Sequence, residues 1–360
     1  MLSICVQGLE KAELHEIAER LGEKPFRGTQ VFEWVHKKRA IDFEQMSNIG
    51  VATRALFESE FNLESLELAE KQTARDGSQK YVFRCSDGQA IESVLIPHNY
   101  GYSVCVSTQA GCRMACVFCA SATGGLARDL SAAEIVGQVL YVQRGLDDCG
   151  QRVSRVDFMG CGEPLDNYDN VVKSIRIMTD PSGLAIGARK ITLSTCGLAP
   201  EIRRLAREGL QVTLSVSLHA PDDATRTTIM PVNKRYPLKQ VLEACGEYSR
   251  MTGRRVTYEY ALIDGLNDSV NCARDLSRLL RGKMAHVNLI PLNPVSGRTY
   301  VRSDAQSVMA FCRELERHGV PASIRREMGS EIAAACGQLR RRELDADGRR
   351  LEKRAGKRDK

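Results

Sequence analysis

The feature that most constrains the fold is an alternation of short β-rich runs with amphipathic helical stretches between about residues 103 and 327. Six such runs occur, at 104–106, 156–159, 190–193, 212–216, 256–260 and 286–290. Helical stretches separate or follow them, at 132–144, 201–208, 239–250, 269–281 and 305–318. This alternation is typical of parallel strands covered by helices. Six strands are too few for a closed eight-stranded barrel. The sequence therefore predicts an α/β fold, a partial (β/α)6 TIM-like barrel with its site at the carboxyl ends of the strands.

The remaining residues form segments on either side of this barrel. We expect an N-terminal helical accessory domain, a β-hairpin linker, the barrel core and a basic disordered tail, at residues 1–65, 66–100, 101–339 and 340–360. In the first of these, Phe32 and Trp34 are expected to pack in the core of the domain. Its basic residues are candidates for contacts with nucleic-acid phosphates, namely Arg27, Lys37, Lys38 and Arg39.

Composition narrows the class of protein further. A formal net charge of +6 and a pI near 8.6 suit a nucleic-acid partner without proving one. Thirteen cysteines, an odd number spread along 360 residues, disfavour a disulfide framework and favour a reducing compartment. The sequence has no apolar run of about 18 residues and no secretory leader. We therefore expect no membrane partner and a cytoplasmic location. The basic patches suggest an RNA-facing surface, so we also expect a monomer.

Three cysteines lie within eight residues, at Cys112, Cys116 and Cys119, with the spacing C-x3-C-x2-C. A short loop of this kind can wrap one iron–sulfur cluster, because all three thiolates reach the same centre. A [4Fe–4S] cluster has four irons, so three thiolates leave one iron open to an outside ligand. A structural zinc site needs four protein ligands, and no fourth Cys or His follows nearby. The triplet therefore favours one [4Fe–4S] cluster over a zinc-binding structural protein or a run of buried cysteines.

Polar and glycine-rich segments follow several of the predicted strands. Gly162 and Glu163 follow the second strand, where glycine lets the backbone approach a ligand and the carboxylate can accept from an ammonium group. Similar segments follow the third, fourth and sixth strands, and they contain Ser194, then Ser217, Leu218 and His219, and then Asn293. Because these loops gather on one rim with the cysteine loop, they predict one pocket for a polar cofactor.

Three further residues are candidates for chemistry. Cys336 lies among small residues in Ala-Ala-Ala-Cys-Gly, which leave its sulfur accessible. Cys105 lies on the first predicted strand, seven residues before Cys112, and should approach the same pocket. Glu92 is a carboxylate within an apolar strand, which either faces water or points into a site that raises its pKa.

These motifs together resemble the RlmN-type adenine-C2 methyltransferases of bacteria, radical S-adenosylmethionine (SAM) enzymes that modify 23S rRNA and tRNA. The resemblance covers nearly the whole chain. Besides the cysteine triplet, it rests on Cys-Val-Ser-Thr-Gln-Ala-Gly-Cys at 105–112, Gly-Glu-Pro-Leu at 162–165, Leu-Ser-Thr at 193–195, Ser-Leu-His-Ala-Pro at 217–221, Met-Pro-Val-Asn at 230–233 and Ala-Cys-Gly-Gln-Leu at 335–339. One departure is Cys161, where the family usually has Met or another apolar residue.

The resemblance implies a role for each candidate residue. Cys112, Cys116 and Cys119 would ligate the cluster. The residues that would contact SAM are Gly162, Glu163, Ser194, Ser217, Leu218, His219 and Asn293. Cys336 would carry the methyl group, Cys105 would resolve the RNA adduct by forming a disulfide with it, and Glu92 would accept a proton. The chemistry implies two SAM molecules per turnover, an electron donor such as a flavodoxin or ferredoxin system, and a thiol reductant that resets the cysteine pair.

Two other functions remain open from the sequence alone. Cfr-type enzymes methylate C8 of the same rRNA adenosine and share most of these motifs, so the motifs barely separate C2 from C8. A non-catalytic iron–sulfur protein that binds RNA also fits the basic charge, although intact Cys105 and Cys336 disfavour it. The sequence leaves open whether rRNA, tRNA or both are substrates.

Overall fold

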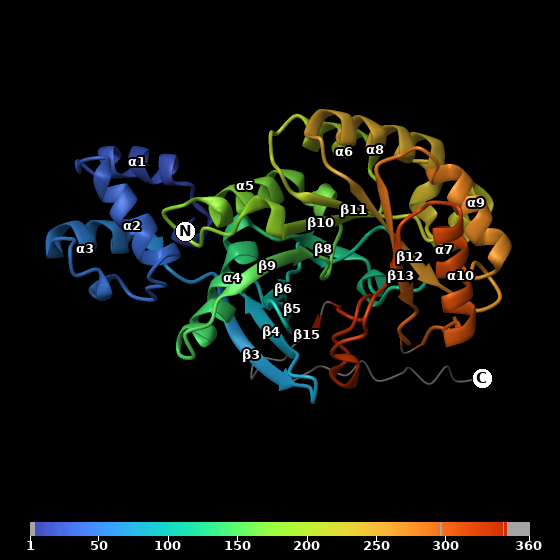
Figure 1. Ribbon diagram of the computed structural model, residues 1–360. Coiled ribbons are helices and arrows are strands. Elements are labelled where there is room, and N and C mark those ends of the chain that lie inside the picture. Colours follow the sequence, from blue (N-terminus) through green and yellow to red (C-terminus); the bar gives the residue numbers. More distant parts are fainter. Residues whose placement is uncertain (1–3, 296, 341, 344–360) are drawn as a thin grey trace, which may run out of the picture.

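The computed structural model describes residues 4–295, 297–340 and 342–343 (Figure 1). The chain begins with a small helical module that contains α1 (Lys11–Arg20), α2 (Phe26–His36) and α3 (Val51–Glu60). Two short strands, β1 (Ile4–Cys5) and β2 (Phe61–Asn62), pair in parallel and close this module. Phe32 is fully buried in its core and Trp34 is half-buried against that core, as the sequence predicts.

Ion pairs fix the helical module against the barrel. Lys11 lies 3.2 Å from Asp180, and Lys173 lies 2.7 Å from Glu13. Arg39, one of the candidates for phosphate contacts, instead pairs with Asp147. Among the other candidates, Lys37 and Lys38 are exposed and Arg27 is half-buried. The Lys38 ammonium lies 3.5 Å from the centre of the Trp34 ring, so this cation already has an aromatic partner.

In the part of the chain that the structure describes, a single mixed sheet of eleven strands forms the frame of the barrel. Its antiparallel part contains β3 (Leu66–Thr73), β4 (Gln79–Cys85) and β5 (Gln89–His98). β6 (Gly101–Cys105) is antiparallel to β5 and parallel to β9, and therefore joins the two parts of the sheet. The parallel part continues through β9 (Val153–Phe158), β10 (Ile191–Thr195), β11 (Thr213–Ser217), β12 (Val256–Leu262), β13 (Ala285–Pro291) and β14 (Ala322–Ile324).

Helices follow the parallel strands and lie on the outside of the curved sheet (Figure 1). They are α4 (Ala132–Asp147), α5 (Tyr168–Thr179), α6 (Ala199–Ala206), α7 (Asp223–Ile229), α8 (Leu238–Thr252), α9 (Val270–Leu280) and α10 (Ala305–Arg317). The start of α4 is fixed by a capping box, in which Ser131 and Glu134 each accept the other's backbone N–H.

The alternation of residues along the parallel strands separates the two faces of the sheet. On β10, Ile191 and Leu193 are fully buried in the apolar core, whereas Thr192 and Ser194 line cavities inside the barrel. On β11, Leu214 is likewise buried in the core, and its neighbour Ser215 lines the interior. The apolar face therefore packs in the core, and the polar face forms the lumen.

The predicted fold class is confirmed, because all six predicted strands are present in one parallel array and a β-hairpin precedes them. A seventh parallel strand, β14, was not predicted, because its three residues are too short to show a period. The predicted tail overlaps β15 (Arg342–Glu343), which pairs with β5, and most of its other residues lie outside the described part of the chain. Within the described ranges, no helix has the length and apolar composition needed to cross a bilayer.

Candidate active site

A cavity of about 170 Å³ lies beside the cysteine loop and the carboxyl ends of the parallel strands. The predicted site residues that line it are Cys112, Cys116, Cys119, Gly162, Glu163, Ser194, Ser217, His219, Asn293 and Cys336. Leu218 is not part of this lining; it is fully buried, and its carbonyl accepts from Arg226 Nε at 3.1 Å. The structure thus brings the cysteine triplet and nearly all the predicted SAM contacts to one place. We call this space the cofactor cavity.

The cysteine loop is closed by a short hairpin of β7 (Gln109–Gly111) and β8 (Leu126–Asp129). Gly111 has a φ of 90°, and a Cβ at this position would lie 1.9 Å from the Gly125 carbonyl oxygen. Only glycine therefore permits this closure. Further along the loop, the Val117 N–H donates to the Ile229 carbonyl at 3.0 Å, which ties the loop to the end of α7.

The thiols of the triplet fit an iron–sulfur cluster in kind and in place. All three line the same cavity, and burial raises the pKa of Cys116 to about 12 and also raises the pKa of Cys112. Binding of a cluster would therefore have to displace their protons. Across the described residues, no three His, Cys, Asp or Glu side chains converge on a single-ion site. A cluster with irons at several corners does not need such convergence, since each thiolate binds a different iron.

Glu163 offers a buried carboxylate on the same cavity. It is only 3% exposed, and its two oxygens accept from the backbone N–H groups of Leu165 at 3.0 Å and Cys196 at 2.7 Å. Burial raises its pKa, so its ionised form would gain from a cationic ligand. The adjacent Gly162 has a φ of 111°, and a Cβ there would come within 2.7 Å of the Thr108 hydroxyl. A side chain at this position would therefore clash with Thr108 and Gln109 of the protein, so the turn that precedes Glu163 requires glycine.

His219 and Asn293 supply further polar groups. His219 Nδ1 accepts from the Ala261 N–H at 2.9 Å, which leaves Nε2 as the donor of a neutral ring. Burial lowers the pKa of His219 to about 3, so the ring is neutral at physiological pH. Asn293 Nδ2 donates to the Cys336 carbonyl at 3.0 Å, whereas its buried Oδ1 has no partner in the described residues. An unpartnered buried acceptor beside the cavity fits a hydrogen-bonding ligand such as SAM.

Arg226 holds the loops of this rim together. It lies on α7 and is fully buried. Its guanidinium donates to the carbonyls of Cys196, Ser217, Leu218 and Tyr236 and to Asn233 Oδ1. In the sequence, an Arg among Asp and Thr residues is typical of an exposed helix, so no local signal marks this residue.

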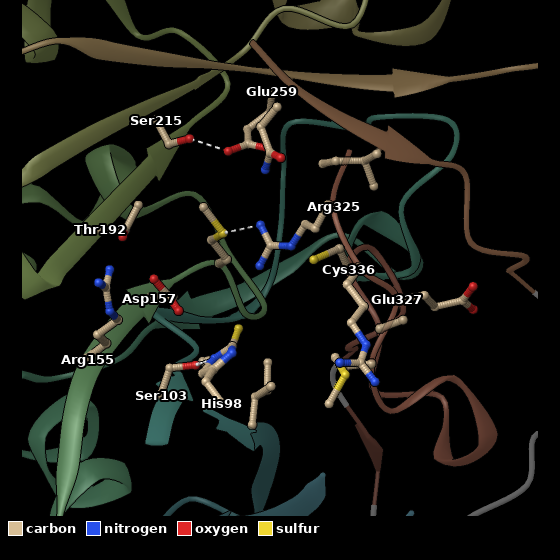
Figure 2. A pocket seen from close by; sticks show the side chains of 18 of the residues that line it. His98, Ser103, Arg155, Asp157, Thr192, Ser215, Glu259, Arg325, Glu327 and Cys336 are labelled. Atoms are coloured by element: carbon tan, nitrogen blue, oxygen red, sulfur yellow. Dashed lines mark hydrogen bonds between the residues drawn. The ribbon is translucent and has the colours of Figure 1, made fainter. Parts of the chain in front are cut away.

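A second, larger cavity of about 630 Å³ opens inside the barrel, and we call it the barrel cavity (Figure 2). Cys105 and Cys336 both line it, and Cys336 lines the cofactor cavity as well. Cys105 belongs to a small apolar cluster with Ala334 and Leu339, which flank Cys336 in the sequence. The structure thus places both predicted reactive cysteines on one cavity, with Cys336 at the junction of the two spaces.

Charged residues surround Cys336 in the barrel cavity (Figure 2). The pKa of Arg325 is held above its usual range by nearby negative charges. The largest contribution comes from a Cys336 thiolate, and smaller ones come from Glu259 and Asp157. Burial raises the pKa of Cys336, and the positive charge of Arg325 opposes this rise. Arg325 Nη1 also donates to Met159 Sδ at 3.3 Å. No local pattern in the sequence marks Arg325, whereas Glu259 lies inside a β-rich run, a signal comparable to that of Glu92.

Glu92 lies in the lining of neither cavity. It is 1% exposed on β5, and its Oε2 accepts from the Arg340 N–H at 2.9 Å. Cys161 is also fully buried and outside both linings. The thirteen cysteines all lie in the described part of the chain, and each is a free thiol there.

Two family descriptions match the chain. The Radical SAM superfamily matches residues 106–275, and the ribosomal RNA large subunit methyltransferase N-terminal domain matches residues 5–62. Similar curated proteins carry the name "Probable dual-specificity RNA methyltransferase RlmN", and two of them illustrate the match. The protein of Geobacillus kaustophilus is 49% identical over 344 residues, which covers 96% of this chain and 94% of the relative. The protein of Symbiobacterium thermophilum is 51% identical over 337 residues, which covers 93% of this chain and 91% of the relative.

A solved structure resembles the chain over most of its length. It is the crystal structure of a radical SAM methyltransferase from Sphaerobacter thermophilus, with a TM-score of 0.91 and 42% sequence identity. The match covers 93% of this chain and 99% of that one.

Proposed function

This chain belongs to the RlmN family of radical SAM enzymes, and from this premise we propose that it methylates C2 of adenosine in 23S rRNA and tRNA through a methylated cysteine, Cys336. The observation that carries the proposal is the position of Cys336 in the linings of both cavities. A cysteine that receives a methyl group from SAM and passes it to a base has to face both the donor and the acceptor. The junction of the two cavities meets that requirement.

The cofactor cavity would hold one [4Fe–4S] cluster through Cys112, Cys116 and Cys119. SAM would bind beside it, against Gly162, Glu163, Ser194, Ser217, His219 and Asn293, the predicted contacts that line this cavity. Cluster and SAM together supply one-electron chemistry that activates a C–H bond, which C2 of adenine requires because this electrophilic carbon does not attack a methyl group by a polar route. Glu163 would face the SAM ammonium group, and Asn293 Oδ1 would gain the partner that it lacks.

The two reactive cysteines would then act in sequence. The Cys336 thiolate attacks the methyl carbon of a first SAM, and S-adenosylhomocysteine leaves. A second SAM, reduced by one electron from the donor, would take a hydrogen atom from that methyl group and leave as methionine and 5′-deoxyadenosine, so that the carbon can join C2. The base is then tethered to the Cys336 sulfur. The resemblance gives removal of the C2 proton to Glu92, but this residue lines neither cavity, so its contacts do not support that role. Cys105 attacks the Cys336 sulfur so that product leaves and a Cys105–Cys336 disulfide remains. A thiol reductant then reduces this disulfide to two thiols and is itself oxidised to a disulfide.

The barrel cavity would receive the target adenine, because it is the space that both Cys105 and Cys336 line. A base can reach it only after leaving its stack, so we expect the target to lie in a loop or to be extruded. Lys37 and Lys38 would contribute phosphate contacts from the N-terminal domain. We also propose a cytoplasmic monomer, an electron donor such as a flavodoxin or ferredoxin system, and domain boundaries near residues 65, 100 and 339.

Nucleoside mass spectrometry of rRNA and tRNA from cells that lack the gene tests this function. We expect 2-methyladenosine to disappear and to return with the wild-type gene, but not with the Cys336→Ala variant. That variant should retain iron and still cleave SAM, which a non-catalytic RNA-binding protein would not do. Loss of 8-methyladenosine instead would assign the chain to C8 chemistry, and unchanged RNA would contradict the proposal.

The Cys105→Ala variant tests the resolving step separately. Without this thiol, the bond between Cys336 and the base has no internal nucleophile to release it. We expect a covalent protein–RNA species that migrates more slowly on a denaturing gel and disappears after nuclease digestion. Normal turnover without such a species would remove Cys105 from the mechanism.

A further inference from the structure

The segment that carries Cys336, residues 329–340, has little regular structure of its own. It contains one short 3-10 turn (Ser330–Ile332), and it has positive φ angles at Gly329, Ala333 and Gly337. Such a segment does not place a side chain by its own hydrogen-bond ladder. The position of the Cys336 sulfur therefore depends on contacts from neighbouring elements.

One set of contacts comes from the cofactor side. The Ala120 N–H donates to the Gly337 carbonyl at 2.8 Å, and Ser121 Oγ donates to the Leu339 carbonyl at 2.7 Å. Both donors follow directly after Cys119, the last cysteine of the triplet. These contacts depend on the shape of a loop that must itself take up a cluster.

Single hydrogen bonds come from Asn293 Nδ2 to the Cys336 carbonyl at 3.0 Å and from the Gly329 N–H to Asp76 Oδ2 at 2.8 Å. A further set comes from two buried charged side chains on the antiparallel part of the sheet. Lys80 on β4 and Glu92 on β5 are 2% and 1% exposed, and Lys80 Nζ lies 3.9 Å from Glu92 Oε1. Lys80 Nζ donates to the Ile332 carbonyl and lies 3.4 Å from the Ala333 carbonyl. Glu92 Oε2 accepts from the Arg340 N–H at 2.9 Å. The pair therefore holds the segment on both sides of Cys336.

We propose that the buried Lys80–Glu92 pair positions Cys336, by holding both arms of its segment so that the sulfur stays at the junction of the two cavities. The proposal rests on the function proposed above and adds Lys80 to it. Lys80 and Glu92 are positioning residues here, because they bind the backbone of the segment and line neither cavity.

The chemistry of the pair suits this role better than a purely stabilising one. Apolar residues of similar volume often stabilise a core as well as a buried ion pair does. A buried ion pair differs from apolar residues because its hydrogen bonds are directional. The ammonium binds carbonyl oxygens and the carboxylate binds N–H groups at fixed positions. Cys336 has to face SAM, the base and Cys105 in turn. With both arms held, the segment presents its sulfur to each partner from one place.

This role and a proton-accepting role for Glu92 give different expectations. A proton acceptor acts only after the base is bonded to Cys336, so its loss leaves free Cys336 unchanged. A positioning pair acts before RNA is present, so its loss changes the exposure and the reactivity of Cys336 in the protein alone. Lys80 separates the two roles further, because a lysine without contact to either cavity has no part in accepting the proton.

The test uses the full-length protein with its cluster reconstituted and no RNA. Three quantities are measured: amide hydrogen exchange of residues 329–340, the rate of Cys336 alkylation by iodoacetamide, and SAM-dependent methylation of Cys336 by peptide mass spectrometry. For Lys80→Met we expect about ten-fold or larger increases in exchange and alkylation and a comparable fall in methylation, as the loss of one charge-assisted hydrogen bond implies. Glu92→Gln should show smaller changes in the same direction, because an amide oxygen can still accept from Arg340. Lys80→Arg, which keeps the donors, should restore most of the wild-type behaviour.

Glu134→Gln is the matched control, because Glu134 is also a buried carboxylate paired with a cation, Arg128, on an element that does not hold the Cys336 segment. It should leave all three quantities at their wild-type values.

Wild-type exchange and alkylation in folded Lys80→Met would overturn the proposal. So would Glu92→Gln with normal Cys336 reactivity and a block only after RNA is bonded. If Lys80→Met does not fold, Glu92→Gln gives the decision, because normal Cys336 exchange and alkylation in this variant overturn the proposal. If the wild-type protein methylates no RNA, the proposed function fails, while exchange and alkylation still decide on the pair.

Discussion

Replacement of Arg226 by Met is the perturbation whose effect the structure defines best. The side chain is fully buried, and its guanidinium donates to four carbonyls and one side-chain amide. Three of these carbonyls lie at the carboxyl ends of β10 and β11: Ser217 ends β11, and Cys196 and Leu218 are the residues that directly follow the two strands. Met preserves much of the apolar stem and removes every donor. The variant therefore leaves five acceptors without their present partner.

The magnitude follows from the cost of unpaired buried acceptors. Each buried carbonyl that loses its partner costs about 1–3 kcal/mol, and the loss of a buried charge returns part of this cost by removing its desolvation penalty. Burial does lower the pKa of Arg226, which shows that the penalty is present. Because neighbouring carbonyls share one donor group, the costs do not simply add. We expect the free energy of unfolding to fall by about 3–5 kcal/mol.

Urea unfolding of the apo-protein, followed by circular dichroism, measures this change. Arg204→Met is the control, because Arg204 is half-exposed, pairs with Asp169 and lies over the Tyr168 ring at 3.8 Å. We expect the control to lose less than about 1 kcal/mol, as for other exposed ion pairs. SAM affinity should fall for Arg226→Met and remain unchanged for Arg204→Met. A loss of less than about 1 kcal/mol for Arg226→Met would refute the reasoning, because it would mean that water replaces the guanidinium at these carbonyls.

Three shorter predictions concern the site and the N-terminal module. Gly162→Ala should lose SAM binding in equilibrium dialysis while it retains iron, because its Cβ would lie 2.7 Å from Thr108 Oγ1 and its φ of 111° strains any other residue. Arg325→Met should shift the pH profile of Cys336 alkylation upward, because the guanidinium lowers the pKa of this thiol against the effect of burial. Burial lowers the pKa of His36 to about 3, below its unfolded value near 6.5. The stability that neutral His36 contributes is therefore complete above about pH 6.5 and is lost as pH falls toward 3. Urea midpoints of His36→Gln should depend less on pH across that window, and an unchanged slope would contradict the assignment.

The sequence predicted those parts of the fold that local spacing determines. Alternation of apolar and polar residues, as in Ile191–Thr195, identified a strand with one face in the core and the other in the lumen. The C-x3-C-x2-C spacing correctly placed three thiols on one cavity, because a loop of eight residues cannot carry them far apart. Polar segments after strands met on one rim for the same reason, since parallel strands end at the same edge of a sheet.

The parts that could not be predicted depend on contacts between distant residues. Lys80 binds the carbonyl of Ile332, which lies 252 residues further along the chain. No local sequence pattern predicts a contact over this separation. The sequence around Arg226 is typical of an exposed helix, but the side chain is fully buried in the structure. β14 is too short to show alternation, although it carries the chain directly to Arg325. Each of these features depends on where the sheet brings other backbone groups.

The irregular segment around Cys336 places its sulfur where the two cavities meet. Both cavities lie on the lumen side of the sheet, and Glu259 on β12 and Ile290 on β13 line both of them, so strand residues at this boundary also face the two spaces. Cys336 differs from these residues because its backbone is not held in the sheet ladder. Its position therefore needs support from other elements. The cysteine loop gives that support on one side and the Lys80–Glu92 pair on the other. Loss of either support should therefore impair methylation of Cys336 before it impairs the fold of the barrel.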